Sequence, residues 1–168
     1  MSNVIELKQF VVQQRRPNTG CIPTAYEIIL RAAGITGVDY PSFQDTFDLD
    51  RFGGPPQNDF GSVANAISNV YPFISFRQES FSKEDGAKKL ARIEELLAMQ
   101  KQVAVSLTLH PSGGWHIMVV LDVTGDYLTL LHHVDTNGDI KEMKVSKSDF
   151  VKIHDEWPGG EQIAYLFS

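Results

Sequence analysis

From Val103 onward the sequence is divided into short apolar segments, separated by turn residues, that are typical of β-strands. Before this point, apolar residues recur at the three- and four-residue spacing of helices. A block of helices followed by a block of strands predicts an α+β fold with an antiparallel sheet, because a parallel sheet would need alternating strands and helices. The predicted strands of this second block are residues 103–109, 115–123, 127–135, 140–145 and 163–167.

The size of the chain fits one globular domain covering residues 1–168. It has 42% apolar and 21% charged residues, an ordinary composition for a chain that buries a core. Within this domain we expect a helical lobe over about residues 10–100 and a β-sheet lobe over about residues 101–168. The lobes meet near residues 100–103, and a boundary of this kind is a natural place for a cleft.

Charge, hydropathy and cysteine content exclude several classes of protein. The net charge is −6 and the basic residues are scattered, which argues against nucleic acid as a partner. No apolar run approaches the roughly 18–20 residues that cross a bilayer, and residues 1–8 lack the features of a signal peptide. A single cysteine can form neither an internal disulfide nor a cysteine-rich zinc site. We therefore expect a cytoplasmic protein that does not bind membranes.

Other elements of the first block are predicted from caps and periodicity. Residues 73–81 are typical of a strand, and a capping box at 82–85 predicts a helix that ends near Gln100. A second box, at 146–149, predicts a short helix before the last strand. Asp59 is a suitable cap for a helix whose inner face would carry Val63, Ala66, Ile67 and Val70. Residues 37–58 have no clear period and are predicted to be an irregular surface segment.

The one cysteine, Cys21, lies where a loop enters a predicted helix. Pro23 suits the first turn of a helix, where its missing N–H costs nothing. Residues 24–33 carry apolar side chains at helical spacing, and Gly34 is a suitable residue to end the helix. Cys21 is thus predicted at the N-terminal end of a central, mostly buried helix. There the helix dipole lowers the pKa of a thiol from its ordinary value of about 8.5, which favours the nucleophilic thiolate.

A histidine and an aspartate complete a candidate catalytic triad. His116 stands at the mouth of one predicted strand and Asp135 at the end of the next. A thiol, an imidazole base and a carboxylate that orients the base are the parts of an activated nucleophile. A hairpin turning at Thr124 and Gly125 would place His116 opposite His133, with Asp135 diagonal to it on the same face, about 7–8 Å away. An odd register without a compensating bulge would send Asp135 to the opposite face.

An oxyanion hole would need a second hydrogen-bond donor beside the backbone N–H of Cys21. Gln13 and Gln14 precede the cysteine by eight and seven residues, and either side-chain amide could supply it.

These parts together resemble the papain-like cysteine peptidases, and most of all their bacteriocin-processing, double-glycine branch. The resemblance covers about residues 10–167. It rests on a glutamine and a cysteine at a helix start, a histidine before an apolar strand, and Asp135 followed by the Gly-containing turn 136–138. The helix start at 148–150 followed by Trp157 is also similar. The chain departs from the family where Ile22 and Pro23 follow the cysteine in place of glycine, and in the longer spacing of its glutamine.

The resemblance implies a papain-like fold in which a central helix packs on the antiparallel sheet. It implies Cys21 as nucleophile, His116 as base, Asp135 as the group that holds the imidazole, and Gln14 as the oxyanion donor. The implied activity is a thiol-dependent hydrolase, a cysteine peptidase cleaving a peptide or isopeptide-type amide of a peptide or protein substrate through an acyl-enzyme. No metal and no organic cofactor is implied.

Three other interpretations remain open. His116, His133 and Asp135 could instead hold Zn²⁺ or Fe²⁺, in which case added Zn²⁺ would raise the melting temperature. A non-catalytic binding module could keep the scaffold and use its aromatic residues to bind a partner, namely Tyr40, Phe43, Phe47 and Phe52. The same Cys and His also serve transferases that move an acyl or γ-glutamyl group to an amine.

Overall fold

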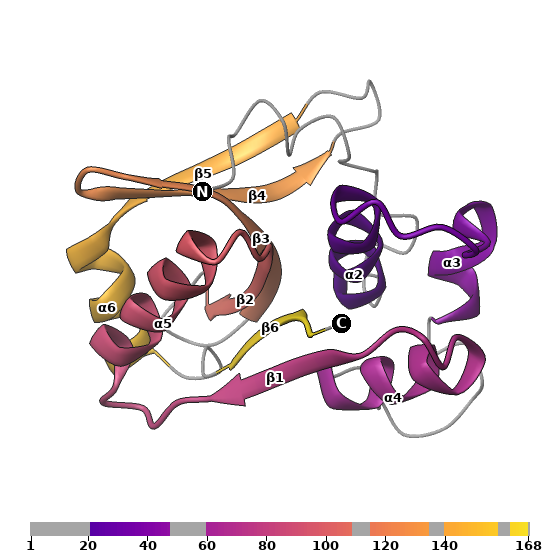
Figure 1. Cartoon of the computed structure of the whole chain (residues 1–168). Helices are drawn as coiled ribbons and strands as arrows, with labels where there is room; N and C mark the ends of the chain where they lie inside the picture. The colour runs from indigo at the N-terminus through magenta and orange to yellow at the C-terminus, as the bar shows by residue number, and fades with distance from the viewer. Residues whose placement is uncertain (1–20, 48–59, 109–114, 135–139, 158–161, 168) are drawn as a thin grey trace.

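The computed structural model describes residues 21–47, 60–108, 115–134, 140–157 and 162–167 (Figure 1). The helices of these residues are α2 (Cys21–Ala32), α3 (Tyr40–Thr46), α4 (Phe60–Val70), α5 (Gly86–Ala98) and α6 (Lys147–Glu156). The strands are β1 (Phe76–Ser80), β2 (Val103–Thr108), β3 (Trp115–Thr124), β4 (Tyr127–Val134), β5 (Ile140–Ser146) and β6 (Gln162–Leu166).

The described strands form one six-stranded sheet in the order β1-β6-β2-β3-β4-β5, with every neighbouring pair antiparallel. The predicted α+β class is therefore confirmed, and the strands of the second block are observed close to their predicted bounds. β1 precedes α5 in the chain, yet it joins the sheet at its edge by pairing with β6. The prediction for residues 37–58 was incomplete, since α3 forms within this segment.

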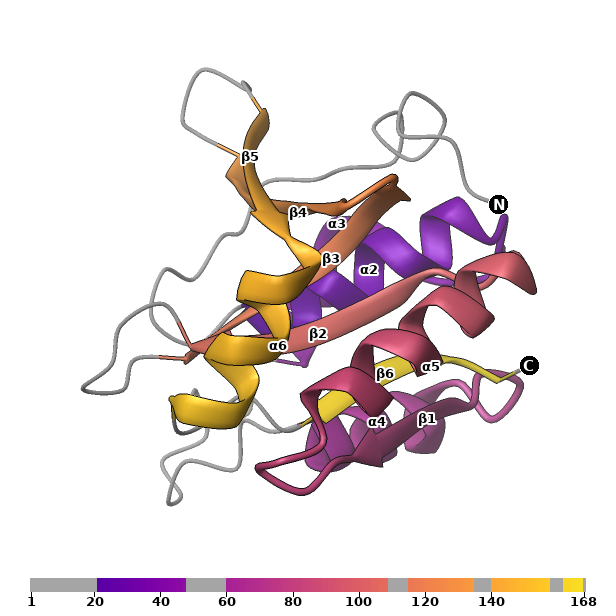
Figure 2. The same cartoon turned by 90° about the vertical axis from the view of Figure 1, so that its left-hand side faces the viewer.

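Helices cover both faces of the sheet (Figures 1 and 2). One apolar cluster unites α2, α3 and α4 with one face, and a second unites α5 and α6 with the other. Successive side chains of β3 point to opposite faces of the sheet and so join different clusters. Ile117 and Val119 belong to the first cluster, whereas Met118 and Val120 belong to the second. The central strands are thus buried on both sides, which explains their nearly continuous apolar sequence.

Helix α2 ends in the Schellman motif that its sequence predicts. The N–H of Gly34 donates to the carbonyl of Arg31 and the N–H of Ile35 donates to that of Leu30, at 3.1 Å each. Gly34 has a φ of +72°, in the left-handed region that favours glycine. The role of Gly34 as the residue that ends the helix is therefore confirmed.

Helix α5 ends in the same motif with glutamine in place of glycine. Gln100 has a φ of +62°, and the N–H of Lys101 donates to the carbonyl of Leu96 at 3.0 Å. A side chain in the left-handed region costs about 1–2 kcal/mol, whereas glycine costs roughly 0.5–1 kcal/mol through the entropy of the unfolded chain. We expect Gln100→Gly to stabilise the protein by about 0.5–1 kcal/mol in urea unfolding. Met99→Gly, one residue earlier at a φ of −82°, is the matched control and should destabilise it. A loss of stability in both variants would contradict this account of the helix end.

Three elements are joined by a cluster of Glu79, Arg92 and Tyr165 from β1, α5 and β6. The Arg92 Nε donates to both carboxylate oxygens of Glu79 at 3.1 Å, and the Tyr165 hydroxyl donates to Glu79 Oε2 at 2.6 Å. Partial burial by itself raises the pKa of Glu79, but the hydrogen bonds from Arg92 and Tyr165 outweigh it, so the pKa lies below its ordinary value.

This cluster predicts a pH dependence of stability. The pKa of Glu79 is lower in the folded than in the unfolded chain. The ionised carboxylate therefore contributes its full stabilisation above the unfolded-state pKa of about 4.3, and this stabilisation is lost as the pH falls through the folded-state pKa. Urea unfolding should therefore show Glu79→Gln less stable than wild type at pH 7, with the difference shrinking toward pH 3. Exposed Glu84 supplies the control, since Glu84→Gln should show no such trend. A Glu79→Gln difference that is constant with pH would refute the prediction.

Candidate active site

The N-terminal end of α2 holds the predicted nucleophile. Cys21 is the first residue of α2 and Pro23 lies in its first turn, so the predicted helix start is confirmed. Residues 22–30 are all buried, which makes α2 the central helix of its side of the sheet. The unpaired N–H groups at such a helix start favour a thiolate over a thiol.

The helix runs alongside β2 in the opposite direction (Figure 2). Ile29 in its last part shares a pocket with Gln102, the residue that precedes β2. A 12-residue helix is about 18 Å long and a 6-residue strand about 20 Å. The first turn of α2 is therefore directed toward the end of the sheet where β2 ends.

The predicted base begins the neighbouring strand at this same end. Trp115 and His116 open β3, and they pair with Thr108 and Leu107 at the end of β2. His116 is half-buried. β3 therefore begins at the end of the sheet toward which the first turn of α2 is directed.

The alternation of β3 assigns His116 to the α5 face of the sheet. Its partner Leu107 and its second neighbour Met118 belong to the cluster with α5, whereas Ile117 belongs to the cluster with α2. His116 is the second residue of β3, so it lies close to the end of the sheet. For a Cys–His pair to form, its imidazole has to reach past this end of the sheet to the α2 side, where Cys21 begins the helix.

The predicted register between β3 and β4 was wrong. Val119 pairs with Leu131, where a register opposing His116 to His133 would pair it with Leu130. The turn contains only Gly125 and Asp126, with a positive φ at the glycine, and a bulge lies between Val120 and Asp122. A second irregularity lies between Leu131 and His133, where β4 pairs with β5. Each one-residue shift in register reverses the face of the sheet to which the following side chains point.

The remaining predicted site residues lie outside the described residues. These are Asp135, Gln14 and its alternative Gln13. The triad and the oxyanion donor therefore stay predictions. Among the described residues, no three His, Cys, Asp or Glu side chains are grouped as they would be around a metal ion. Within the same residues, no helix is both long and apolar enough to cross a membrane.

A buried polar network between α2 and α3 was not predicted. The Thr24 hydroxyl donates to Gln44 Oε1 at 2.9 Å, and the Gln44 amide donates to Glu27 Oε1 at 3.4 Å. Arg31 then donates to the other oxygen of Glu27 at 2.9 Å. The signal in the sequence was a polar stripe at three- and four-residue spacing on an otherwise apolar helix. This network fixes α3 against the first turns of the helix that carries Cys21.

The aromatic residues considered for a binding module pack mainly in the core. Phe43 and Phe47 are buried, with ring centroids 4.8 Å apart. Tyr40 is half-buried and donates its hydroxyl to the carbonyl of Ile35 at 2.6 Å. Burial raises the pKa of Tyr40 although Arg31, 4.4 Å from the ring centre, opposes this. Phe52 lies outside the described residues. These rings stabilise the α2–α3 side and do not form an exposed aromatic surface.

Comparison with known proteins finds structural likeness but no sequence match. No protein-family model matches the chain, and no curated protein sequence matches it. A solved structure of the Pseudomonas avirulence protein AvrPphB is similar over 95% of this chain and 98% of its own, at 12% identity and a TM-score of 0.35. A TM-score below 0.5 does not establish a common fold. What the structure shows is an α+β domain with a six-stranded antiparallel sheet, in which Cys21 begins the buried helix α2 and His116 is the second residue of β3.

Proposed function

We propose that this protein is a papain-like thiol hydrolase that cleaves a peptide or isopeptide-type amide through an acyl-enzyme on Cys21. The observations that support the proposal are that the buried helix α2 starts at Cys21 and that Trp115 and His116 open β3 beside the end of β2. A helix start and a nearby imidazole are the two features that activate a cysteine. Asp135 and Gln14 complete the proposal on the strength of the family resemblance.

The proposed reaction has two halves. The thiolate of Cys21 attacks the amide carbonyl carbon, and the oxyanion is held by the Cys21 N–H and Gln14. As the C–N bond breaks, the imidazolium of His116 gives its proton to the leaving amine. Water then attacks the thioester, His116 takes the water proton, and the C–S bond breaks to release the acid and the thiolate. Asp135 holds the imidazole in the orientation that both transfers need.

A transferase is the alternative that shares this acyl-enzyme, with an amine replacing water in the second half. The sequence does not predict the cleavage specificity of the hydrolase, and cleavage after Gly-Gly is the outcome that the double-glycine resemblance would favour. Both are tested by incubating the protein with a peptide library that includes Gly-Gly sequences, with and without an added primary amine, and detecting products by mass spectrometry.

The proposal expects cleavage products from wild type and none from Cys21→Ala. Amine adducts that exceed acid products would favour the transferase, and a preference for Gly-Gly would support the bacteriocin-processing resemblance. Equal turnover by wild type and Cys21→Ala would rule out a cysteine mechanism.

A further inference from the structure

Strand β1 forms one edge of the sheet and, among the strands that the structure describes, pairs only with β6 (Figure 1). Three of its five residues are exposed, namely Arg77, Gln78 and Ser80. An edge strand presents backbone N–H and C=O groups with which another extended chain can pair. β1 is therefore a place where a further strand can join the sheet.

The backbone of β1 alternates between groups that face β6 and groups that face the open edge, as in any antiparallel pair. The N–H of Phe167 donates to the carbonyl of Ser75 at 2.7 Å, so residue 75 and every second residue after it face β6. The residues whose N–H and C=O face the open edge are Phe76, Gln78 and Ser80. Each of them offers one donor and one acceptor to an added strand.

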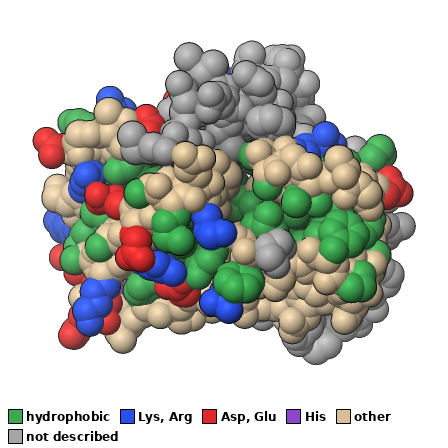
Figure 3. Space-filling view, in the orientation of Figure 1, with side chains coloured by type: hydrophobic (Ala, Val, Ile, Leu, Met, Phe, Trp, Pro, Cys, Tyr) green, Lys and Arg blue, Asp and Glu red, His purple; other side chains and the backbone are tan. Residues whose placement is uncertain are grey.

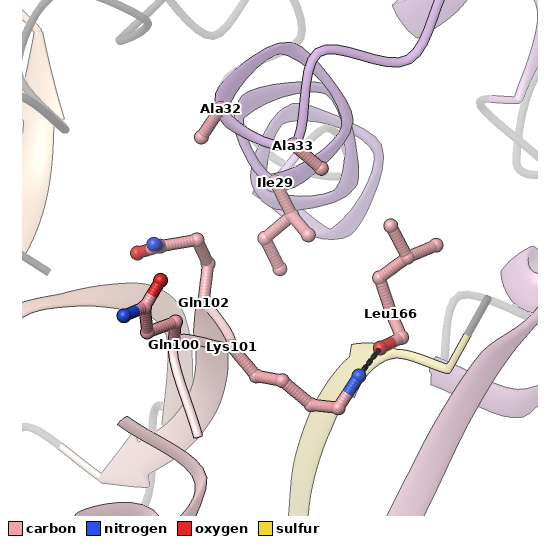
Figure 4. Close-up of a pocket in the computed structure, with 7 residues that line it drawn as sticks. All are labelled: Ile29, Ala32, Ala33, Gln100, Lys101, Gln102 and Leu166. Atoms are coloured by element: carbon pink, nitrogen blue, oxygen red, sulfur yellow. Dashed lines mark hydrogen bonds between the residues drawn. The ribbon is translucent and has the colours of Figure 1, made fainter. Parts of the chain in front are cut away.

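The contacts of β6 agree with this assignment. Leu166 pairs with Phe76, and its carbonyl accepts from the ammonium of Lys101, which precedes β2 on the other side of β6, at 3.1 Å (Figure 4). This contact lies at a pocket of about 150 Å³, in the region where the sequence predicts a cleft. Gln162 pairs with Ser80 and likewise turns its N–H to β2. Both residues of β6 thus direct these groups away from β1, as their pairing with edge-facing residues requires.

The side chains of β1 are complementary to those of a second copy of the same strand. Arg77 and Glu79 lie on one face of β1, because side chains alternate along a strand. In a two-fold antiparallel pair centred on Gln78, Arg77 of each copy lies opposite Glu79 of the other. The edge-facing backbone groups then meet as well, with Gln78 opposite Gln78 and Phe76 opposite Ser80. Arg77 and Glu79 form the pairs without backbone hydrogen bonds, in which opposite side chains come closest.

Charge also selects this register over its neighbours. A pair centred on Arg77 would place the two copies of Arg77 opposite each other, and a pair centred on Glu79 would do the same for the two carboxylates. Like charges directly opposite are destabilising in a sheet, whereas opposite charges stabilise the pair. The centre at Gln78 turns both charged residues of the strand into attractive pairs.

Both charged groups have the capacity for this contact. The Glu79 carboxylate accepts from Arg92 and Tyr165, but its side chain keeps 31% of its surface exposed, and a carboxylate has about four acceptor positions. The guanidinium carbon of Arg77 lies 3.6 Å from the centre of the exposed Phe167 ring. Exposed contacts of this kind are weak, so the guanidinium can turn toward the edge. Figure 3 shows both signs of charge on the part formed by α5 and α6, and hydrophobic side chains over α2 and α3.

We propose that β1 is a self-association edge, at which two copies of this chain pair antiparallel about Gln78 and join their sheets. Because each copy contributes a strand of five residues, the interface is small, and we expect a weak dimer with a Kd on the order of 100 µM. The inference does not depend on the proposed hydrolase, since it uses none of the candidate site residues.

Sedimentation velocity of the full chain between about 5 and 500 µM tests the proposal, because the dimer fraction of wild type should rise with concentration. Arg77→Glu should weaken the dimer by at least about 10-fold, since two attractive pairs become two repulsive ones. Lys144→Glu is the matched control. It makes the same change of charge at an exposed position of β5, on the opposite edge of the sheet, and should keep the wild-type Kd.

A mixing experiment tests the pairing itself. Glu79→Lys should also fail to self-associate, because it places cations opposite each other. A mixture of Arg77→Glu with Glu79→Lys again opposes unlike charges at both positions, so it should form a heterodimer with about the wild-type Kd. If Glu79→Lys does not fold, Gln78→Pro is the second test. It removes an N–H that faces the edge and keeps those that face β6, so it should fold and remain monomeric.

Four results would overturn the proposal. They are a wild type that stays monomeric over the whole concentration range, a dimer that Arg77→Glu or Gln78→Pro leaves intact, equal weakening by Lys144→Glu and Arg77→Glu, and a mixture of the two folded charge variants that stays monomeric.

Discussion

A peptide electrophile such as an acyloxymethyl ketone is expected to label wild type at neutral pH and to leave Cys21→Ala unlabelled, because the chain has a single cysteine. His116→Ala should slow this labelling by about 100-fold or more, the usual contribution of a positioned acid–base group. The second-order rate constant, followed by intact-protein mass spectrometry, measures both effects.

His154 supplies the control for the loss of an imidazole. It is buried in α6, on the face of the sheet opposite to α2, and its Nε2 lies 2.8 Å from the carbonyl of Ser82. A glutamine can make the same hydrogen bond, so His154→Gln should keep the wild-type labelling rate. Equal slowing by His154→Gln and His116→Ala would show a general loss of structure and would remove His116 from the proposed mechanism.

The largest expected loss of stability comes from Tyr26, which holds α2 against α4 and β1. Its side chain is fully buried, its hydroxyl donates to the carbonyl of Phe60 at 2.9 Å, and its ring stacks on Phe76 at 4.0 Å between centroids. We expect Tyr26→Ala to lower the free energy of unfolding by about 3–5 kcal/mol through the cavity it leaves. Tyr26→Phe should lower it by about 1–3 kcal/mol, because the Phe60 carbonyl then loses a donor.

Urea unfolding checks both values, with Tyr127 as the comparison. Tyr127 is 47% exposed at the start of β4, and its ring lies 4.6 Å from the Lys144 ammonium. Tyr127→Ala should therefore cost no more than about 1 kcal/mol. A Tyr26→Ala variant as stable as Tyr127→Ala would contradict the central place of α2 in the core.

The sequence predicted those helix ends that are formed by contacts between residues close together in the chain. Gly34 ends α2 as expected, and the Ser146 hydroxyl accepts from the Asp149 N–H at 3.0 Å to cap α6. The box at 82–85 failed, because α5 begins only at Gly86. The backbone N–H of Gly86 donates instead to Asp155 Oδ1 of α6 at 2.8 Å. The sequence around residue 86 could not predict this cap, because Asp155 is far away in the chain.

Burial and strand register also depend on contacts between residues that are far apart in the chain. Leu90, Ile93 and Leu97, which recur at helical spacing in α5, are buried. Val70, predicted on the inner face of α4, is 54% exposed, whereas Phe60 is buried. Val70 is the last residue of α4. The β3–β4 register was wrong because the turn consists of Gly125 and Asp126 and a bulge lies between Val120 and Asp122, and a parity argument holds only for strands without a bulge. Composition and periodicity therefore predicted the fold class and the position of Cys21, but not the faces at the strand ends.

The account depends most on the pairing of Cys21 with His116 across the end of the sheet. Titration of the thiolate absorbance near 240 nm, in wild type and in His116→Ala, tests it directly without a substrate. The account predicts a thiol pKa well below the ordinary value of about 8.5 in wild type, and a rise toward that value when the imidazole is removed. A pKa at or above about 8.5 in wild type, unchanged in His116→Ala, would contradict it.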